Sequence, residues 1–255
     1  MNVVSRPGYR AVLAADATGR QRALALRRQC FRSGASIIDD SDAHDPLCQH
    51  LVVEDVATGD VVACCRLMVL GDGREVGTSY SALHYDLGAL AAYRGVMMEV
   101  GRFCIDPARR DPDILRHSWA ALTRLVDRYR VDMLFGCSSF PGTDVTRHRA
   151  AFVTLTRDHA APERWAPGRK SAHIINFADL SVQPARSDHA TALLPPLLRS
   201  YLGMGGWVSN HAVIDRDLDT LHVFTAVEIA AIPPVRARTL RLMAAKIATT
   251  SRSGD

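Results

Sequence analysis

The order of apolar and polar positions predicts helices and strands that alternate along the chain. Apolar residues recur with helical spacing over 18–32, and two strand-like runs at 51–56 and 61–69 are joined by Thr58-Gly59-Asp60, as in a hairpin. A further strand is expected at 96–105. The remaining expected elements are helices at 114–129, 143–158, 195–204 and 235–249, and strands at 131–137, 207–214 and 221–229. Strands with interleaved helices predict an α/β layer fold with a mixed central sheet flanked by helices.

The length and composition suit one sizeable core. The chain has 255 residues, of which 47% are hydrophobic, and no repeat or low-complexity tract interrupts it. A looser stretch at 160–187 is the only candidate linker, and we place no domain boundary there. We therefore expect a single domain over 1–255, in which 191–250 forms a C-terminal extension that completes the sheet and ends in a basic amphipathic helix.

The charge balance is mild. There are 31 basic and 27 acidic residues, and only Lys170 and Lys246 are lysines. The arginines are spread along the chain rather than clustered, which argues against a nucleic-acid partner. No secretory signal is visible and the six cysteines form no C-x-x-C pair, so we expect a cytoplasmic protein with reduced thiols. The histidines lack metal-ligand spacing, and we expect no metal site.

The last expected helix has an apolar face opposite several arginines. Leu240, Met243, Ala244 and Ile247 share that face. This pattern suggests peripheral contact with anionic lipid at the inner face of the cell membrane. The alternative is an ordinary helix that packs on the core. The basic residues of this segment are Arg236, Arg238, Arg241 and Lys246.

One cysteine lies where a nucleophile could stand. Gly136-Cys137-Ser138-Ser139 follows an apolar strand, but it does not match G-x-S-x-G. No adjacent base is identifiable, and we interpret Cys137 as structural.

Charged residues interrupt the apolar strand expected at 96–105. Glu99 and Arg102 are three positions apart, so in a regular strand they point to opposite faces unless a bulge at Gly101 redirects one of them. Buried charges need partners. From the residues alone, both a structural ion pair and a functional site remain open.

The charged residues follow one another in a distinctive order. An R-x-x-x-F helix, a D-x-x-D loop, an arginine on the second hairpin strand and an E-x-x-R-F strand resemble the acyl-homoserine-lactone synthases and their relatives in the GNAT-like acyltransferase superfamily. The residues concerned are Arg27, Phe31, Asp42, Asp45, Arg66, Glu99, Arg102 and Phe103.

Longer strings point to a narrower branch. The runs at 101–107, 134–142, 194–202 and 215–217 resemble the ornithine–acyl-carrier-protein N-acyltransferases, which make lyso-ornithine lipid. His222 stands where relatives of that branch often carry an acidic residue, which is a departure from the pattern.

The resemblance implies an enzyme that transfers a 3-hydroxyacyl chain from acyl carrier protein to the α-amino group of L-ornithine. It implies direct transfer, with no bound cofactor, no metal and the phosphopantetheine thioester as donor substrate. Glu99 would accept the amine proton, Asp42 and Asp45 would hold the side-chain ammonium, and Arg66 or Arg102 would bind the carboxylate. The expected site comprises Glu99 and Arg102 as catalytic residues, with Arg27, Phe31, Asp42, Asp45, Arg66 and Phe103 binding the substrate.

The segment before the helix expected at 114–129 bears on the identity of the acyl donor. Arg109-Arg110-Asp111-Pro112-Asp113 has no glycine with which to cradle a pyrophosphate, so an acyl carrier protein with its single phosphodiester fits better than a coenzyme A thioester. Arg109 and Arg110 would meet that phosphate or the acidic carrier surface.

Two alternatives stay open. One is an acyl-homoserine-lactone synthase that uses acyl carrier protein, although the tryptophans usual in its N-terminal region are absent and Trp119, Trp165 and Trp207 all lie later. The other, from a different class, is a non-catalytic Arg-rich binding protein.

Overall fold

The structure of the protein is a computed structural model, which describes residues 8–14, 16–32, 40–180 and 193–252, with side chains up to residue 247. Parts of the looser stretch and of the C-terminal extension, at 181–187 and 191–192, lie outside the described residues. The chain divides into two compact units, and the single domain over 1–255 stays a prediction. Unit 1 comprises 1–68, 100–129 and 235–255, and unit 2 comprises 69–99 and 130–234.

Most of the expected elements are present. The strands are β1 (Tyr9–Leu13), β2 (Gln49–Asp55), β3 (Val61–Leu70), β4 (Tyr85–Asp86), β5 (Met97–Ile105), β6 (Met133–Pro141), β7 (Gly168–Arg169), β8 (Ile174–Asn176), β9 (Trp207–Val208), β10 (His211–Asp215) and β11 (Thr220–Glu228). The α-helices are α1 (Ala17–Phe31), α2 (Ser81–His84), α3 (Pro112–Tyr129), α4 (Arg149–Asp158), α5 (Pro196–Leu202) and α6 (Pro234–Arg252). The strand expected at 207–214 is divided into β9 and β10, and the sequence pattern did not predict β1, β4, β7, β8 or α2.

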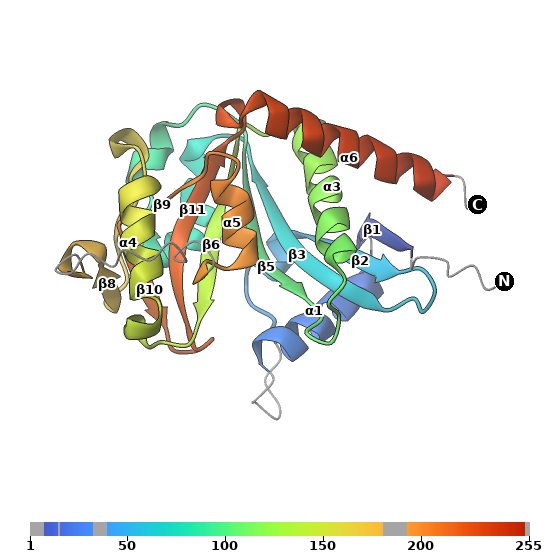
Figure 1. Cartoon of the computed structure of the whole chain (residues 1–255), viewed down its shortest axis with the longest axis horizontal. Coiled ribbons are helices and arrows are strands. Elements are labelled where there is room, and N and C mark those ends of the chain that lie inside the picture. The colour runs from blue at the N-terminus through green and yellow to red at the C-terminus, as the bar shows by residue number, and fades with distance from the viewer. Residues whose placement is uncertain (1–7, 15, 33–39, 181–192, 253–255) are drawn as a thin grey trace. The chain divides into compact units, whose positions relative to one another are not determined.

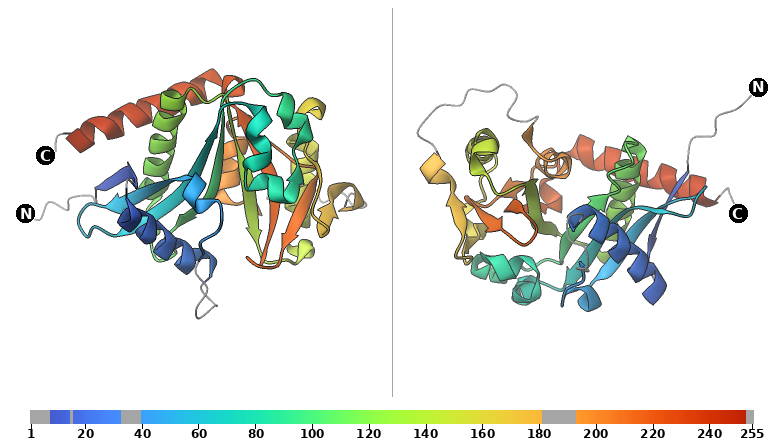
Figure 2. Two further views of the ribbon diagram at one scale, coloured as in Figure 1. Left: turned by 180° about the vertical axis from the view of Figure 1, so that it is seen from behind. Right: turned by 90° about the horizontal axis from the view of Figure 1, so that it is seen from below.

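In unit 1, strands β1, β2 and β3 pair antiparallel in that order. Helices α1 and α3 lie on opposite faces of these strands (Figures 1 and 2). Both faces of the strands can pack against a helix, because successive side chains along a strand point to opposite sides of the sheet. Val53 packs with Ile114 of α3, whereas its neighbour Val52 packs with Ala23 and Leu26 of α1.

Side-chain caps fix where the unit 1 helices begin. Asp16 accepts a hydrogen bond from the backbone N–H of Gly19 and so caps α1. Asp111 does the same for the N–H of Asp113 at the start of α3, and its second oxygen accepts from the Tyr9 hydroxyl at 3.0 Å. Each aspartate therefore supplies a hydrogen-bond acceptor to the first turn of its helix.

In unit 2, the first residues of β5 pair parallel with β6, and β6 pairs antiparallel with β11 along nine residues. Strands β10 and β8 continue the sheet beyond β11. Helices α4 and α5 cover one face, where Phe140 packs with Phe152 and Leu198. The segment 73–92, which contains α2, covers the other face (Figure 2). The sheet is thus mixed and carries helices on both sides.

Helix α6 packs inward with the face that the sequence suggested for lipid. Leu240 and Ala244 are buried, Met243 and Ile247 are half-buried, and Arg241 forms an ion pair with Asp127 of α3 at 3.1 Å. This face therefore packs largely as that of an ordinary helix does, which is the alternative that the sequence left open, and contact of α6 with lipid stays a prediction. Within the described residues, no helix is long and apolar enough to cross a membrane.

Candidate active site

The Glu99 carboxylate is buried in unit 2 and accepts three hydrogen bonds. Its Oε2 accepts from the backbone N–H of Tyr80 at 2.9 Å. Its Oε1 accepts from the backbone N–H of Ser81 at 2.7 Å and from the Ser81 hydroxyl at 2.6 Å. Both donors lie at the start of α2, whose first N–H groups have no partner inside the helix. Glu99 therefore holds the segment 73–92 on the sheet as well as presenting a carboxylate.

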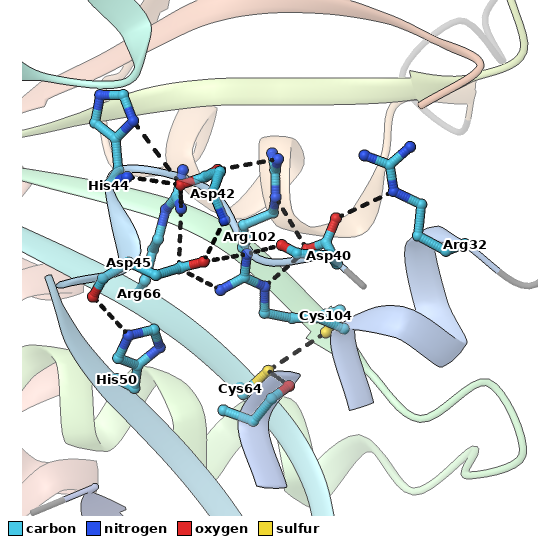
Figure 3. A network of polar contacts seen from close by, with 12 residues as sticks. Arg32, Asp40, Asp42, His44, Asp45, His50, Cys64, Arg66, Arg102 and Cys104 are labelled. Atoms are coloured by element: carbon cyan, nitrogen blue, oxygen red, sulfur yellow. Dashed lines mark hydrogen bonds and ion pairs between the residues drawn. The ribbon is translucent and has the colours of Figure 1, made fainter. Parts of the chain in front are cut away.

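The charged residues predicted in unit 1 are brought together with two further residues in one ionic cluster (Figure 3). Arg27 reaches Asp40 at 2.8 Å and Asp45 at 2.5 Å, and Arg66 reaches Asp45 at 3.0 Å. Four guanidiniums surround three carboxylates, which leaves one positive charge in excess. The members of the ionic cluster are Arg27, Arg32, Asp40, Asp42, Asp45, Arg66 and Arg102.

Hydrogen bonds from the arginines lower the pKa of two aspartates of the cluster, Asp42 and Asp45. Burial raises the pKa of Asp45, but hydrogen bonds from Arg27 and Arg66 outweigh it and lower the pKa to about 2. The pKa of Asp42 is likewise lowered, since burial is outweighed by the hydrogen bond from Arg66. Burial lowers the pKa of His50, whose Nε2 lies 3.1 Å from the Asp45 carbonyl oxygen. The arginines thus favour the charged forms of Asp42 and Asp45, while burial disfavours the charged form of His50.

Exposure separates the members of the cluster that a small molecule can reach from those that support them. The side chain of Asp42 is 25% exposed and that of Arg102 is 10% exposed, whereas that of Arg27 is only 1% exposed. Arg27 is thus enclosed by its carboxylate partners. From this buried position Arg27 can hold the loop that carries Asp42 and Asp45 in place.

Arg102 adopts a left-handed backbone conformation, with φ at +51°. A non-glycine residue in this region is uncommon, and it interrupts the alternation of the strand. The interruption that redirects the side chain lies at Arg102 itself rather than at Gly101, where the sequence suggested it. As a result Arg102 reaches Asp40 at 3.2 Å and Asp42 at 3.3 Å.

The two phenylalanines of the expected site are half-buried. The guanidinium of Arg102 lies 5.9 Å from the ring centroid of Phe31, which is within the range of a cation–π contact. Phe31 therefore borders the cluster from α1. Phe103 follows Arg102 on β5, and its predicted role in substrate binding stays a prediction.

The two arginines before α3 have different surroundings. Arg109 contacts Asp55 at 3.2 Å and Asp60 at 3.4 Å, so its guanidinium is held by unit 1. Arg110 is exposed. The start of α3 already carries the Asp111 cap, and this negative charge opposes an anion at the helix N-terminus. Arg110 is thus the more exposed of the two, and the predicted contact of either arginine with a carrier protein stays a prediction.

Sequence reasoning missed four residues of these sites, namely Arg32, Asp40, Tyr80 and Ser81. Asp40 contacts Arg27, Arg32 and Arg102, yet it sits in a run of aspartates where nothing distinguishes it. Tyr80 and Ser81 donate hydrogen bonds to Glu99 from 19 and 18 positions away in the chain, respectively. No local sequence spacing could reveal these two donors. A glutamate expected to be buried does, however, indicate that some hydrogen-bond donor must contact it.

The chain shows clear similarity to known acyltransferases. A family model described as an acetyltransferase (GNAT) domain matches residues 26–120. The chain is 31% identical over 198 residues to the L-ornithine N(alpha)-acyltransferase of Rhodobacter capsulatus, and the match covers 76% of each protein. It is 29% identical over 201 residues to the protein of the same name from Brucella abortus, covering 76% of this chain and 71% of the relative.

A solved structure supports the fold. FeeM, an N-acyl amino acid synthase from uncultured soil microbes, is 12% identical and aligns with a TM-score of 0.50 over 88% of this chain and 94% of FeeM. This likeness concerns the fold alone. Together with the family model, it confirms the predicted GNAT-like acyltransferase fold with a mixed central sheet flanked by helices.

Proposed function

Since this chain belongs to the L-ornithine N(alpha)-acyltransferase family, we propose that it moves a 3-hydroxyacyl chain from acyl carrier protein to the α-amino group of L-ornithine, giving lyso-ornithine lipid. The observation that carries this proposal is the 31% identity to a relative of that name over 76% of the chain. The chain is an acyltransferase with a GNAT domain. The donor, the acyl group and the amino acid are the parts that we propose.

The ionic cluster suits an amino acid with two charged ends. Ornithine carries an α-carboxylate and a side-chain ammonium at neutral pH. The cluster has one positive charge in excess, and its Arg102 is partly exposed, so Arg102 suits the α-carboxylate of ornithine. Arg66 would support this contact from a more buried position. Asp42, the most exposed of the three aspartates, fits the ammonium. Asp45 and Arg27 then act by positioning these groups.

Glu99 is the proposed acceptor of the amine proton. Attack on a thioester needs a neutral amine, and a positioned carboxylate can take the proton. Glu99 lies on β5, and its carboxylate is held by donors from Tyr80 and Ser81 in unit 2.

The proposed donor is an acyl carrier protein. The segment before α3 has no glycine loop for a pyrophosphate, and Arg110 presents an exposed positive charge beside it. An acidic carrier surface would pair with that charge, and salt would screen the pairing. No bound cofactor is part of the proposal.

We place the reaction in the cytoplasm, with product release at the inner face of the membrane. The apolar stripe of α6 is occupied, so exposed Arg236 and Arg238 would supply the contact with anionic lipid. Flotation with vesicles tests this part: binding to anionic but not neutral vesicles at low salt is expected, and failure to float with either retires it.

The direct test is an acylation assay with mass detection. The protein is incubated with 3-hydroxyacyl carrier protein and each amino acid in turn, and the acylated product is identified by mass. Acylation of ornithine at its α-nitrogen is expected. Acylation of a different amino acid would contradict the substrate, and the absence of any acyl transfer from the carrier protein would contradict the donor.

A further inference from the structure

Cys137 stands at the end of a hydrogen-bonded row that begins at Glu99. The Ser81 hydroxyl lies 2.6 Å from Glu99 Oε1, and the Cys137 Sγ lies 3.5 Å from the Ser81 oxygen. All three residues belong to unit 2. They come from three elements, β5, α2 and β6, so their alignment depends on the folded unit.

The direction of these hydrogen bonds is fixed by chemistry. An ionised carboxylate can only accept, so the single hydroxyl hydrogen of Ser81 is directed at Glu99. In the contact between Ser81 and Cys137, the thiol must then be the donor. Both donors consequently point toward Glu99, which is the arrangement that a proton moving inward requires.

Exposure increases along the same row. Ser81 is fully buried and Glu99 is 4% exposed, whereas Cys137 is half-buried. On β6, side chains alternate between the two faces, and Ser139, on the same face as Cys137, is exposed. Cys137 is therefore the member of the row that a substrate can reach.

We infer that Cys137 is a catalytic residue that passes the proton of the substrate amine to Glu99 through Ser81. This inference rests on the proposed function, and it specifies how a buried Glu99 serves as the base. The amine N–H proton moves to Cys137 Sγ as the thiol proton moves to Ser81 Oγ and the hydroxyl proton moves to Glu99. The sulfur and the hydroxyl oxygen each gain and lose one proton, so Glu99 is the only member of the row that changes its charge. As the amine nitrogen bonds the thioester carbon, the carbon–sulfur bond of the thioester breaks and the donor leaves as its thiolate.

A proton relay fits this site better than an acyl-enzyme formed on the sulfur. A nucleophilic cysteine acts as a thiolate. Here a thiolate would form beside the negative charge of Glu99, and like charges disfavour one another. In the relay the sulfur stays neutral throughout. The structure therefore assigns to Cys137 a different role from the structural one that its sequence context suggested.

Three variants test the relay against a matched control. Cys137→Ala and Ser81→Ala interrupt the row, and each should lower turnover about 10²-fold or more, the lower end of what a general base contributes. Cys137→Ser keeps a group that can accept and donate, and it should retain turnover within about tenfold of the wild type. Cys48→Ala removes a half-buried thiol from unit 1 and should leave turnover unchanged.

The pH profile distinguishes a relay from a structural role. Raising the pH neutralises more of the free amine, so the deficit of Cys137→Ala should shrink as the pH rises, with an unchanged melting temperature. A Cys137→Ala enzyme with wild-type turnover and pH profile would overturn the inference. Equal loss in Cys137→Ala and Cys137→Ser would also overturn it, as would an acyl group found on Cys137 by peptide mass spectrometry.

A second measurement does not depend on the substrate. Alkylation of Cys137 by iodoacetamide, followed by peptide mass, should be faster in Ser81→Ala and Glu99→Gln, which remove the hydrogen-bond acceptor and the opposing charge. Unchanged alkylation rates would show that the row is not formed and would overturn the inference. If the wild type acylates an amine other than ornithine, the proposed function fails while the relay is tested with that amine.

Discussion

Arg27 and Asp45 form an ion pair inside unit 1, with Arg27 Nη1 and Asp45 Oδ1 2.5 Å apart and side chains 1% and 5% exposed. Both side chains are too buried for water to solvate their charges. The cost of removing one member of such a pair is the cost of leaving the other charge buried. The pair therefore couples α1 to the loop that carries the aspartates.

Arg27→Ala should lower the free energy of unfolding by about 3–5 kcal/mol, because Asp40 and Asp45 lose their shared partner. Urea denaturation followed by circular dichroism measures this. Arg241→Ala is the control: its pair with Asp127 is about half exposed and should be worth less than about 1 kcal/mol. Equal effects of the two substitutions would contradict the structural importance of the cluster.

Acid should weaken unit 1 through Asp45. Its pKa is about 2 in the folded protein against an ordinary value of 3.8, so its contribution to stability is fully present above about pH 4 and is lost as the pH falls toward 2. Asp45→Asn should therefore be less stable than the wild type at pH 7, and the difference should narrow between pH 4 and pH 2. Melting temperatures of both proteins across that range check this. A difference independent of pH would mean that the charge of Asp45 is not what stabilises the loop.

The resemblance to the GNAT-like acyltransferases predicted which charged residues belong to one site, but it did not predict how their side chains are oriented. The order of Arg27, Asp42, Asp45, Arg66 and Arg102 was readable because each lies in a short motif. Their mutual pairing was not, since pairing depends on which loop folds beneath which strand. The redirection of β5 occurs through a left-handed arginine, and no pattern of apolar residues predicts such a conformation.

The partners of Glu99 were hidden for a related reason. Its apolar neighbours on β5 predicted a buried carboxylate, and burial is what the structure shows. Its donors, however, come from Tyr80 and Ser81 in a segment without strong periodicity, where the sequence predicted no helix. The contact of Ser81 with Cys137 likewise joins positions 56 residues apart.

Glu99→Gln should affect both stability and turnover. The amide nitrogen of glutamine cannot accept a hydrogen bond, so the N–H of Tyr80 or of Ser81 loses its partner, at a cost of about 1–3 kcal/mol. If Glu99 is the base, turnover should fall about 10²–10⁴-fold and recover in part at higher pH. A variant that melts early but turns over normally would remove Glu99 from the mechanism and leave it as a cap of α2.

Arg110→Glu should weaken the use of acyl carrier protein more than the use of an acyl coenzyme A of the same chain. Reversing one exposed charge at a docking surface is worth about 1 kcal/mol, or about a fivefold rise in KM, and the effect should fade at high salt. Arg20→Glu reverses an exposed arginine on α1 and serves as the control. Equal changes with both donors would argue against a carrier-protein surface at Arg110.

Gly73→Ala should destabilise unit 2 and lower turnover together. A Cβ at Gly73 would lie 1.9 Å from the Leu90 carbonyl oxygen, a clash that only a backbone shift can relieve. Overpacking of this kind costs about 1–3 kcal/mol. The segment that would move leads into α2, so the hydrogen bonds from Tyr80 and Ser81 to Glu99 should be disturbed as well.

Gly77→Ala is the matched control for that substitution, because Gly77 lies in the same turn of 3₁₀ helix, Gly73–Thr78, with nothing within 4 Å of an added Cβ. It should change the free energy of unfolding by less than about 0.5 kcal/mol. Urea denaturation and turnover of the two variants are compared side by side. If Gly73→Ala is as stable as Gly77→Ala yet inactive, the packing of the segment 73–92 affects turnover but not the free energy of unfolding. If both variants match the wild type in stability and turnover, the close packing of Gly73 against Leu90 has no part in placing Glu99.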